Sequence, residues 1–327
     1  MPGMRFLLFL CIAWHAAAGA QECKLARIEE WPVRLERGVP IIDGEINGQK
    51  IAILLDTGTS RSFLTRTAAN KLGLTRYEAG GVMDPRGTGT LETTRIDELK
   101  IGPASRKNWN LPVVGAMDFG SQVSLVLGVD LFSQVDVEFD LPGSAVRLFQ
   151  TRGNCESVTL AYWAKGGATQ VALDRDPSIL FRVSVNGRAM RAGLDSGAEF
   201  SALDAPVAQE LGVTGATPGV VLAGCSIGVG RKAVDYRAAR FDSFVIGDEK
   251  IATPTLRFAD LFGREAGTET GTRLEREATG LPHMLLGADF LRAHRVFVSR
   301  SQGRMYFTYS GGTVFPAGAE KGCQDLR

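Results

Sequence analysis

Short runs in which apolar and polar residues alternate dominate the chain, and this pattern predicts strands more than long helices. Between residues 42 and 55 the alternation continues on both sides of Asn47-Gly48, a dipeptide typical of a two-residue hairpin turn. The same pattern recurs between residues 180 and 194 around Asn186-Gly187. We therefore expect an antiparallel hairpin in each of these regions.

Two further hairpins are indicated by apolar runs that flank a turn. Residues 135–139 and 146–149 enclose Pro142-Gly143, and residues 296–298 and 305–307 enclose Gln302-Gly303. Residues 65–72 and 205–211 instead have helical spacing, and each is followed by a glycine, which commonly ends a helix.

The most informative feature is an internal repeat. Residues 42–75 align with residues 181–214 at an offset of 139 without a gap, and residues 127–131 align with 286–290 at an offset of 159. Between them, Gly87-Thr88-Gly89 matches Gly228-Val229-Gly230 at an offset of 141. Three blocks recur in the same order with a period too long for a solenoid, so the chain is predicted to be a duplicated domain.

One aspartate occupies the same place in each repeat. Asp56 and Asp195 each end an apolar strand and are followed by a small hydroxyl residue and a glycine. If the halves pack about a pseudo-twofold axis, the two carboxyl groups meet, and one of them keeps a proton because both cannot easily be ionised. Such a pair can act as a general base toward water and a general acid toward a leaving amine.

These residues resemble the signature of the aspartic proteases. Its two copies are Asp56-Thr57-Gly58-Thr59-Ser60 and Asp195-Ser196-Gly197-Ala198. Each is followed by an apolar-apolar-Gly block, Val126-Leu127-Gly128 and Leu285-Leu286-Gly287, as in retropepsins and pepsins. The resemblance covers residues 42–149 and 181–307, lengths that look like two fused retropepsin-like domains. It implies an all-β acid-protease fold of two pseudo-twofold-related β-barrel halves with short helices.

The resemblance also implies roles for the matching residues. Asp56 and Asp195 would be catalytic and hold the attacking water, while Thr57 and Ser196 would hydrogen-bond across the interface between the halves. The glycines would permit close approach at the turns or form substrate-binding flaps: Gly58 and Gly197 for the turns, and Gly87, Gly89, Gly228 and Gly230 for the flaps. Asp130 and Asp289 would brace the turns from behind.

The two signatures differ at one position that follows the glycine, where Thr59 aligns with Ala198. By resemblance, Thr59 supports the active-site turn, and its hydroxyl can donate to the neighbouring carboxylate, whereas alanine cannot. This difference suggests the hypothesis that Asp56 is the more readily ionised partner and that Asp195 more often holds the proton.

Composition bears on the class of protein. The chain has 327 residues with Lys+Arg 37 and Asp+Glu 36, a balance without the positive charge expected of a nucleic-acid-binding protein. No cofactor and no metal site are predicted, since the cysteines lack the CxxC spacing of structural zinc sites.

The first residues read as a secretory signal peptide, with Arg5, a nine-residue apolar run, and Ala18-Gly19-Ala20 as the cleavage site. We expect a periplasmic or secreted protein that is not inserted in a membrane once the signal is removed. Cys23, Cys155, Cys225 and Cys323 remain and can pair in three ways, which the sequence leaves open.

The expected organisation is a signal peptide over residues 1–20, an N-terminal half over 21–150, a linker with a connecting hairpin over 151–180, a C-terminal half over 181–310, and a C-terminal tail over 311–327. The expected function is an exported aspartic endopeptidase acting on peptides or proteins. Because one chain supplies both aspartates, a monomer can form the full site.

Two other functions fit the same fold. One is a catalytically silent module that binds an extended peptide through strand edges, and the other is a peptidase dedicated to one envelope substrate. Turnover that disappears when either Asp56 or Asp195 is changed separates an enzyme from a binding module.

Overall fold

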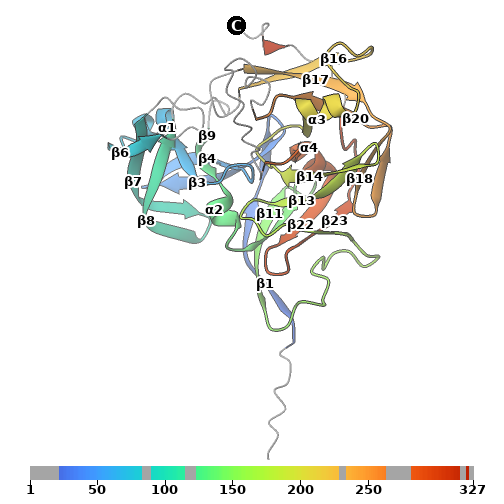
Figure 1. Cartoon of the computed structure of the whole chain (residues 1–327). Helices are drawn as coiled ribbons and strands as arrows, with labels where there is room; N and C mark the ends of the chain where they lie inside the picture. The colour runs from blue at the N-terminus through green and yellow to red at the C-terminus, as the bar shows by residue number, and fades with distance from the viewer. Residues whose placement is uncertain are drawn as a thin grey trace, which may run out of the picture.

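The structure is a computed structural model that describes residues 22–82, 90–114, 123–227, 233–262, 281–316 and 322–323. The predicted signal peptide and the four flap glycines lie outside these ranges. The described residues form mostly strands with four short helices among them, which confirms the predicted all-β class (Figure 1).

Half one is built on an eight-stranded sheet with the order β2-β3-β4-β9-β5-β8-β7-β6, in which β3 also pairs with β7. Its elements are β2 (Arg34–Glu36), β3 (Val39–Ile46), β4 (Gln49–Leu55), β5 (Phe63–Thr65), α1 (Arg66–Lys71), β6 (Arg76–Val82), β7 (Thr90–Ile101), β8 (Ala104–Val114), β9 (Val123–Leu127) and α2 (Val129–Phe132).

Half two is built on a nine-stranded sheet with the order β16-β17-β20-β15-β21-β14-β13-β18-β19. Its elements are β13 (Leu180–Val185), β14 (Arg188–Leu194), β15 (Ala202–Asp204), α3 (Ala205–Glu210), β16 (Val221–Ile227), β17 (Ala233–Arg240), β18 (Ser243–Ile246), β19 (Glu249–Ala252), β20 (Thr255–Ala259), β21 (Met284–Leu286) and α4 (Ala288–Ala293).

The two sheets share one strand order. From β3 to β6 the first sheet runs β3-β4-β9-β5-β8-β7-β6, and the second runs β13-β14-β21-β15-β20-β17-β16. The directions agree as well, because β4–β9 and β14–β21 are parallel while β5–β9 and β15–β21 are antiparallel. The repeat in the sequence is therefore a repeat of one barrel-like half, as predicted.

A third sheet of six strands joins the halves, in the order β1-β11-β10-β22-β23-β12. Its strands are β1 (Lys24–Pro32), β10 (Asp136–Asp140), β11 (Ala145–Arg152), β12 (Thr169–Ala172), β22 (His294–Ser299) and β23 (Arg304–Tyr309). Both further hairpins predicted from the sequence are present, and they pair with each other through β10 and β22. Figure 1 shows this sheet between the two halves.

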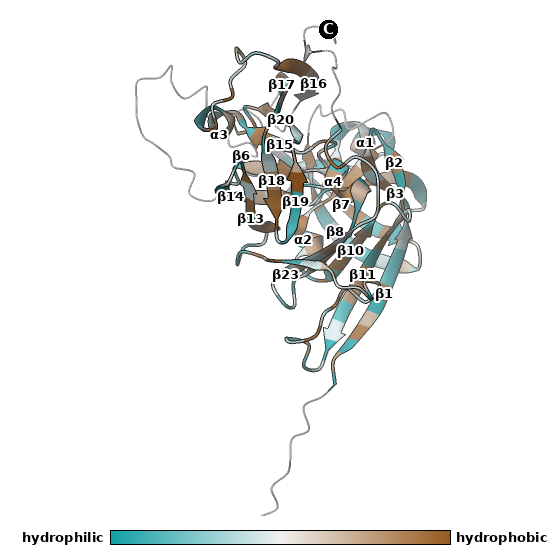
Figure 2. Cartoon of the chain, turned by 90° about the vertical axis from the view of Figure 1, so that its right-hand side faces the viewer, coloured by the Kyte–Doolittle hydropathy of each residue, from teal (hydrophilic) through white to brown (hydrophobic). Residues whose placement is uncertain are grey.

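A continuous apolar core runs through both halves and the shared sheet. Ile53 of half one, Phe181 of half two and Phe307 of the shared sheet are fully buried members of the same cluster. Burial of each such side chain contributes about 1.5–3 kcal/mol. At the rim, β1 is an edge strand with both hydrophilic and hydrophobic bands (Figure 2), and Trp31 is its one buried residue.

The two predicted Asn-Gly hairpins are confirmed. Asn47 and Gly48 have φ of 50° and 77°, and Asn186 and Gly187 have 51° and 77°, the left-handed values that this turn requires. Each asparagine side chain accepts hydrogen bonds from a neighbouring hairpin, at 3.0 Å from the N–H of Asp97 in half one and 2.7 Å from that of Asp242 in half two. The turn residues thus also anchor the strands that lie beside them.

The two helices expected from the sequence are α1 and α3, and each is followed by a glycine with positive φ. The other two helices, α2 and α4, were not predicted. They follow Gly128 and Gly287 and are too short to show helical periodicity in the sequence.

The structure resolves the pairing of the cysteines. Cys23 is bonded to Cys155, and Cys225 is bonded to Cys323, so each bridge ties one terminal segment to the body of the chain. Within the described ranges, no helix is long and apolar enough to cross a membrane. The predicted domain limits stay a prediction, although residues 151–180 supply β12 to the shared sheet.

Candidate active site

The turns that carry Asp56 and Asp195 are placed by parallel strand pairs. Leu55, at the end of β4, lies beside Leu127 of β9, and the N–H of Asp56 donates to the carbonyl of Leu127 at 2.9 Å. In half two, the N–H of Asp195 donates to the carbonyl of Leu286 at the same distance. Each aspartate therefore leaves a buried strand at the same point of its half.

Two hydroxyl side chains lock the turns to each other. The hydroxyl of Thr57 donates to the carbonyl of Leu194 at 2.7 Å and accepts the N–H of Ser196 at 3.0 Å. The hydroxyl of Ser196 donates to the carbonyl of Leu55 at 2.7 Å and accepts the N–H of Thr57 at 3.0 Å. We call these four bonds the reciprocal grip. Because both hydroxyls are buried, these bonds satisfy backbone groups that water does not reach.

The glycine after each hydroxyl residue faces the opposite carboxyl group. A Cβ atom on Gly58 would lie 2.3 Å from Cγ of Asp195, and one on Gly197 would lie 2.4 Å from Cγ of Asp56. Any side chain at either position would collide with the partner's carboxyl group. The structure thus brings Asp56 and Asp195 together across the axis, with both glycines required by their proximity.

In each half, a second aspartate supports the active-site turn through a serine. Asp130 accepts hydrogen bonds from the N–H and the hydroxyl of Ser62, and the Ser62 hydroxyl accepts the N–H of Gly128 at 3.0 Å. Asp289 makes the same contacts with Ser201, whose hydroxyl accepts the N–H of Gly287 at 2.9 Å. The supporting role of the two aspartates was predicted from the sequence, whereas that of the two serines was not.

A signal for the serines was present in the sequence. Ser62 and Ser201 recur at the same offset of 139 as the catalytic signature, although nothing local marks them as bonded to a distant carboxylate. Their role depends on strands that the fold brings together, so only the repeat could have pointed to it.

Arg292 adds a contact between the halves that the sequence analysis missed. Its guanidinium donates from Nη1 to the carbonyl of Gly38 at 2.7 Å and to that of Glu199 at 3.4 Å. Gly38 has φ of 75°, and a Cβ there would lie 2.3 Å from Nη1 of Arg292. The turn between β2 and β3 is therefore fitted against the loop that follows Asp195.

Burial and charge favour one shared proton at the site. Both carboxyl groups are half-buried. Burial raises the pKa of Asp56 well above its usual range, and the charge of Asp195 raises it further. The pKa of Asp195 is raised by burial but is held down by the hydrogen bond from Asp56 and by the N–H groups of Ala198 and Gly197. These contributions favour the proton on Asp56.

This preference is opposite to the one inferred from Thr59. The Thr59 hydroxyl is directed toward the carbonyl of Arg61, at 3.4 Å, and its backbone N–H rather than the hydroxyl lowers the pKa of Asp56. The backbone still supports the turn, because the carbonyl of Thr59 accepts the N–H of Val129 at 2.9 Å. The expected bond from the Thr59 hydroxyl to the carboxylate is not formed, because the side-chain rotamer points the hydroxyl away from the carboxylate. The sequence does not specify this rotamer.

The flap glycines, Gly87, Gly89, Gly228 and Gly230, lie outside the described residues. The strands that flank them do pair as hairpins, β6 with β7 and β16 with β17. Among the described residues, no group of three or more histidine, cysteine or acidic side chains is arranged to hold a metal ion.

Comparisons with known proteins find a match to an aspartyl protease model in each half. Residues 42–134 match the family model described as gag-polyprotein putative aspartyl protease, and residues 181–290 match the model described as aspartyl protease. No curated protein sequence matches the chain. Among solved structures, the chain is similar to a retropepsin-like aspartic protease from Rickettsia conorii, with 22% identity over 41% of this chain and 97% of that one, at a TM-score of 0.30.

Proposed function

We propose that this chain, a retropepsin-like aspartyl protease built from two fused halves, is an endopeptidase that hydrolyses peptide bonds with water held between Asp56 and Asp195. The observation that carries the proposal is the reciprocal grip of Thr57 and Ser196. It fixes the two aspartate turns against each other, so the carboxyl groups face one substrate position from two sides.

The preferred location of the proton decides which aspartate acts as the base and which acts as the acid. Asp195, the ionised partner, accepts a proton from water as the water oxygen bonds to the peptide carbonyl carbon. Asp56 donates its proton toward the carbonyl oxygen, which gains negative charge as the new bond forms. When the tetrahedral species collapses, the C–N bond breaks and the nitrogen takes the proton that Asp195 received. One hydroxyl of the tetrahedral carbon returns its proton to Asp56 as the new carboxyl group forms. The dyad then returns to its state with one proton.

A single chain supplies both turns, so the proposal needs no second copy to complete the site. An extended peptide would lie between the halves, where strand edges would offer backbone groups to it. The substrate is therefore proposed to be a peptide or an extended protein segment.

We also propose that the protein works outside the cytoplasm, in the periplasm or the medium. Two disulfides, Cys23–Cys155 and Cys225–Cys323, support this location because such bridges persist in oxidising compartments. Mass spectrometry of the exported protein should find Gln21 as the first residue. Recovery of intact residues 1–20 on an entirely cytoplasmic protein would contradict the location.

The test of the activity is cleavage of a diverse peptide library by the protein between about pH 3 and pH 8, a range that spans ordinary and raised carboxyl pKa values. Asp56→Asn and Asp195→Asn are expected to lower kcat/KM by about 10²–10⁴-fold each, because each removes one member of an acid–base pair. Asp97→Asn, on an exposed strand of half one, is the matched control and should keep wild-type turnover.

The two alternatives give different outcomes. A folded protein that binds peptides without cutting any would be a peptide-binding module. Cleavage of one envelope protein alone, lost in both dyad variants, would show a dedicated peptidase. Turnover that survives in Asp56→Asn or Asp195→Asn would overturn the assignment of the dyad.

A further inference from the structure

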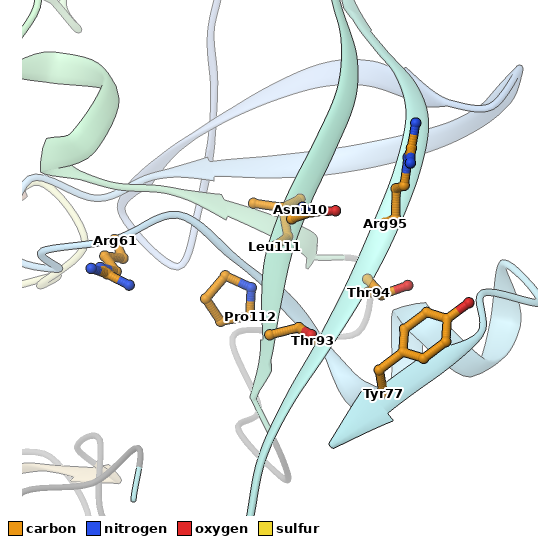
Figure 3. A pocket seen from close by; sticks show the side chains of 8 residues that line it. All are labelled: Arg61, Tyr77, Thr93, Thr94, Arg95, Asn110, Leu111 and Pro112. Atoms are coloured by element: carbon orange, nitrogen blue, oxygen red, sulfur yellow. The ribbon is translucent and has the colours of Figure 1, made fainter. Parts of the chain in front are cut away.

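A hollow of about 560 Å³ lies in half one, beside the segment that follows the Asp56 turn (Figure 3). Its lining includes Arg61, Tyr77 of β6, Thr93 and Arg95 of β7, and Asn110 and Pro112 of β8. Figure 3 shows Arg61 on one side of Pro112 and Tyr77 and Arg95 on the other. We call this feature the Arg61 hollow.

Strand register explains why these side chains share one face. Tyr77 pairs with Thr93, and Thr93 pairs with Pro112, so one row crosses three strands. Residues directly opposite each other on paired strands project to the same side of a sheet. Thr94 and Leu111, one position along, also border the hollow, but they are buried. The hollow is therefore built on the outward rows of a packed sheet.

The charge of the hollow is positive. The Arg61 guanidinium is exposed, and no described carboxylate pairs with it. Arg95 donates from Nη2 to the amide oxygen of Asn108 at 2.7 Å, which is a neutral partner. The nearby carboxylate of Glu92 is bound by Arg66 at 2.9 Å and by Arg76 at 3.4 Å. Two guanidinium groups thus remain with hydrogen-bonding capacity for an anion.

The corresponding place in half two is filled. At the offset of 139, Arg61 corresponds to Phe200. Leu64 pairs with Val113 and the corresponding Leu203 pairs with Phe258, so Pro112 corresponds to Arg257. Arg257 is 4% exposed and stacks 3.5 Å above the Phe200 ring.

The guanidinium of Arg257 is also committed to backbone groups. It donates to the carbonyl of Ala223 at 3.0 Å and to that of Pro316 at 2.9 Å. Its charge is used within the fold, whereas that of Arg61 is not. The arginine therefore lies on the turn in half one and on the strand in half two, and at this pair of corresponding positions the described residues leave half one open.

We propose that the Arg61 hollow is a specificity site that binds an acidic side chain of the peptide substrate. The inference rests on the proposed endopeptidase function and adds a substrate class to it. Arg61 follows Asp56 by five residues, and an extended peptide advances about 3.3 Å per residue. A glutamate or aspartate a few positions from the cleaved bond reaches the hollow, where guanidinium groups form charge-assisted hydrogen bonds with its carboxylate.

The experiment uses pairs of peptides that differ only by Glu or Gln at one of four positions on either side of a cleaved bond. In the wild-type protein, one position should show a Glu/Gln ratio of kcat/KM of about three- to tenfold, the range for charged hydrogen bonds in a partly solvated site. Arg61→Gln should bring this ratio close to one, and Arg95→Gln should lower it in part. Arg66→Gln, which changes an exposed arginine paired with Glu92, is the control and should keep the ratio.

Two further measurements distinguish recognition of the charge of the substrate side chain from recognition of its shape. Arg61→Glu should invert the preference, so that a Lys peptide is cut faster than its Gln counterpart. In the wild-type protein, the Glu preference should fade below about pH 4, where the peptide carboxyl becomes neutral. A Glu/Gln ratio near one at every position, or a ratio that survives in the Arg61→Gln/Arg95→Gln variant, would overturn the proposal.

The same peptides test the site when turnover is absent. Binding of labelled Glu and Gln peptides to the Asp56→Asn variant is measured by fluorescence anisotropy. A preference for Glu that Arg61→Gln removes would support the hollow even if no peptide were cut, in which case only the endopeptidase function would fail. Equal or absent binding of both peptides would overturn the hollow.

Discussion

The two halves agree closely at their active-site turns and differ away from them. The grip distances are 2.7 Å and 3.0 Å from both sides, and the braces of Ser62 and Ser201 differ by 0.1 Å in their bonds to Gly128 and Gly287, at 3.0 Å and 2.9 Å. At the axis, each half supplies the partner for the other half's polar groups. A change on one side would leave a buried group unpaired on the other, so the two turns stay alike.

The outer strands are under no such constraint. In half one, β7 and β8 form one long hairpin, whereas the corresponding stretch of half two is divided into β17, β18, β19 and β20. The division between β19 and β20 falls at Thr253, which has φ of 47°, and Pro254, which cannot donate a ladder hydrogen bond. Half two is also covered by the C-terminal segment, through Phe315 packed edge-on against Phe244 and through Cys323. The face around Arg61 is therefore open in half one, whereas the corresponding place in half two is filled by Phe200 and Arg257.

The largest expected effect comes from removing the disulfide that attaches the C-terminal segment to half two. Replacing both Cys225 and Cys323 by alanine should lower the free energy of unfolding by about 2–4 kcal/mol, because the bridge closes a loop of 98 residues. Replacing Cys23 and Cys155, which are 132 residues apart, should cost nearly the same, since loop entropy grows slowly with length. Denaturant titration measures both. A double variant with wild-type stability would mean that non-covalent contacts alone hold that chain end.

A smaller effect is expected from breaking the grip on either side. Ser196→Ala leaves the carbonyl of Leu55 and the N–H of Thr57 without their partner, and Thr57→Val does the same to Leu194 and Ser196. Each variant should lose about 1–3 kcal/mol of stability and at least tenfold in kcat, because the carboxyl groups lose their fixed separation. Ser178→Ala, on a loop where the serine is partly exposed, is the control. Markedly unequal losses would contradict the equivalence of the two turns.

The smallest effect concerns the proton of the dyad. Both carboxyl groups have raised pKa values in the folded protein, so the fold binds more protons than the unfolded chain above about pH 4 and loses stability as pH rises through the raised range. Asp56→Asn, which resembles the protonated form, should therefore be more stable than the wild type at pH 7, by roughly 1 kcal/mol or about 2–4 °C in Tm. The advantage should vanish near pH 3.

Asp195→Asn should give a smaller gain, because Asp195 is the preferred ionised partner. Thermal unfolding at several pH values measures both variants. An equal gain in the two, or a larger one for Asp195→Asn, would reverse the assignment of the proton.

The sequence predicted much of the fold from local signals. Asn-Gly turns, glycines after short helices and alternating strands are determined by a few adjacent residues, so they could be read without the tertiary structure. The two aspartates were found for a different reason, since the duplication places the same turn in both halves. An internal repeat can be recognised in the sequence even though the contacts between its two copies cannot.

What the sequence could not provide are contacts between residues far apart in the chain. The pairing of β10 with β22, the choice among three disulfide patterns, and the bonds of Ser62 to Asp130 depend on how distant strands meet. The direction of the Thr59 hydroxyl depends on a rotamer, and the expected bond from this hydroxyl to the carboxylate is not formed for that reason.

The sequence by itself therefore determined that the protein is duplicated, strand-rich and supplied with one aspartate per half. Only the tertiary structure decided that burial and the charge of Asp195 raise the pKa of Asp56, and that Arg61 is exposed while Arg257 is enclosed. Protonation and exposure depend on the burial and the charges around a side chain. Those surroundings come from segments that no local pattern connects, such as the Pro316 carbonyl that faces Arg257.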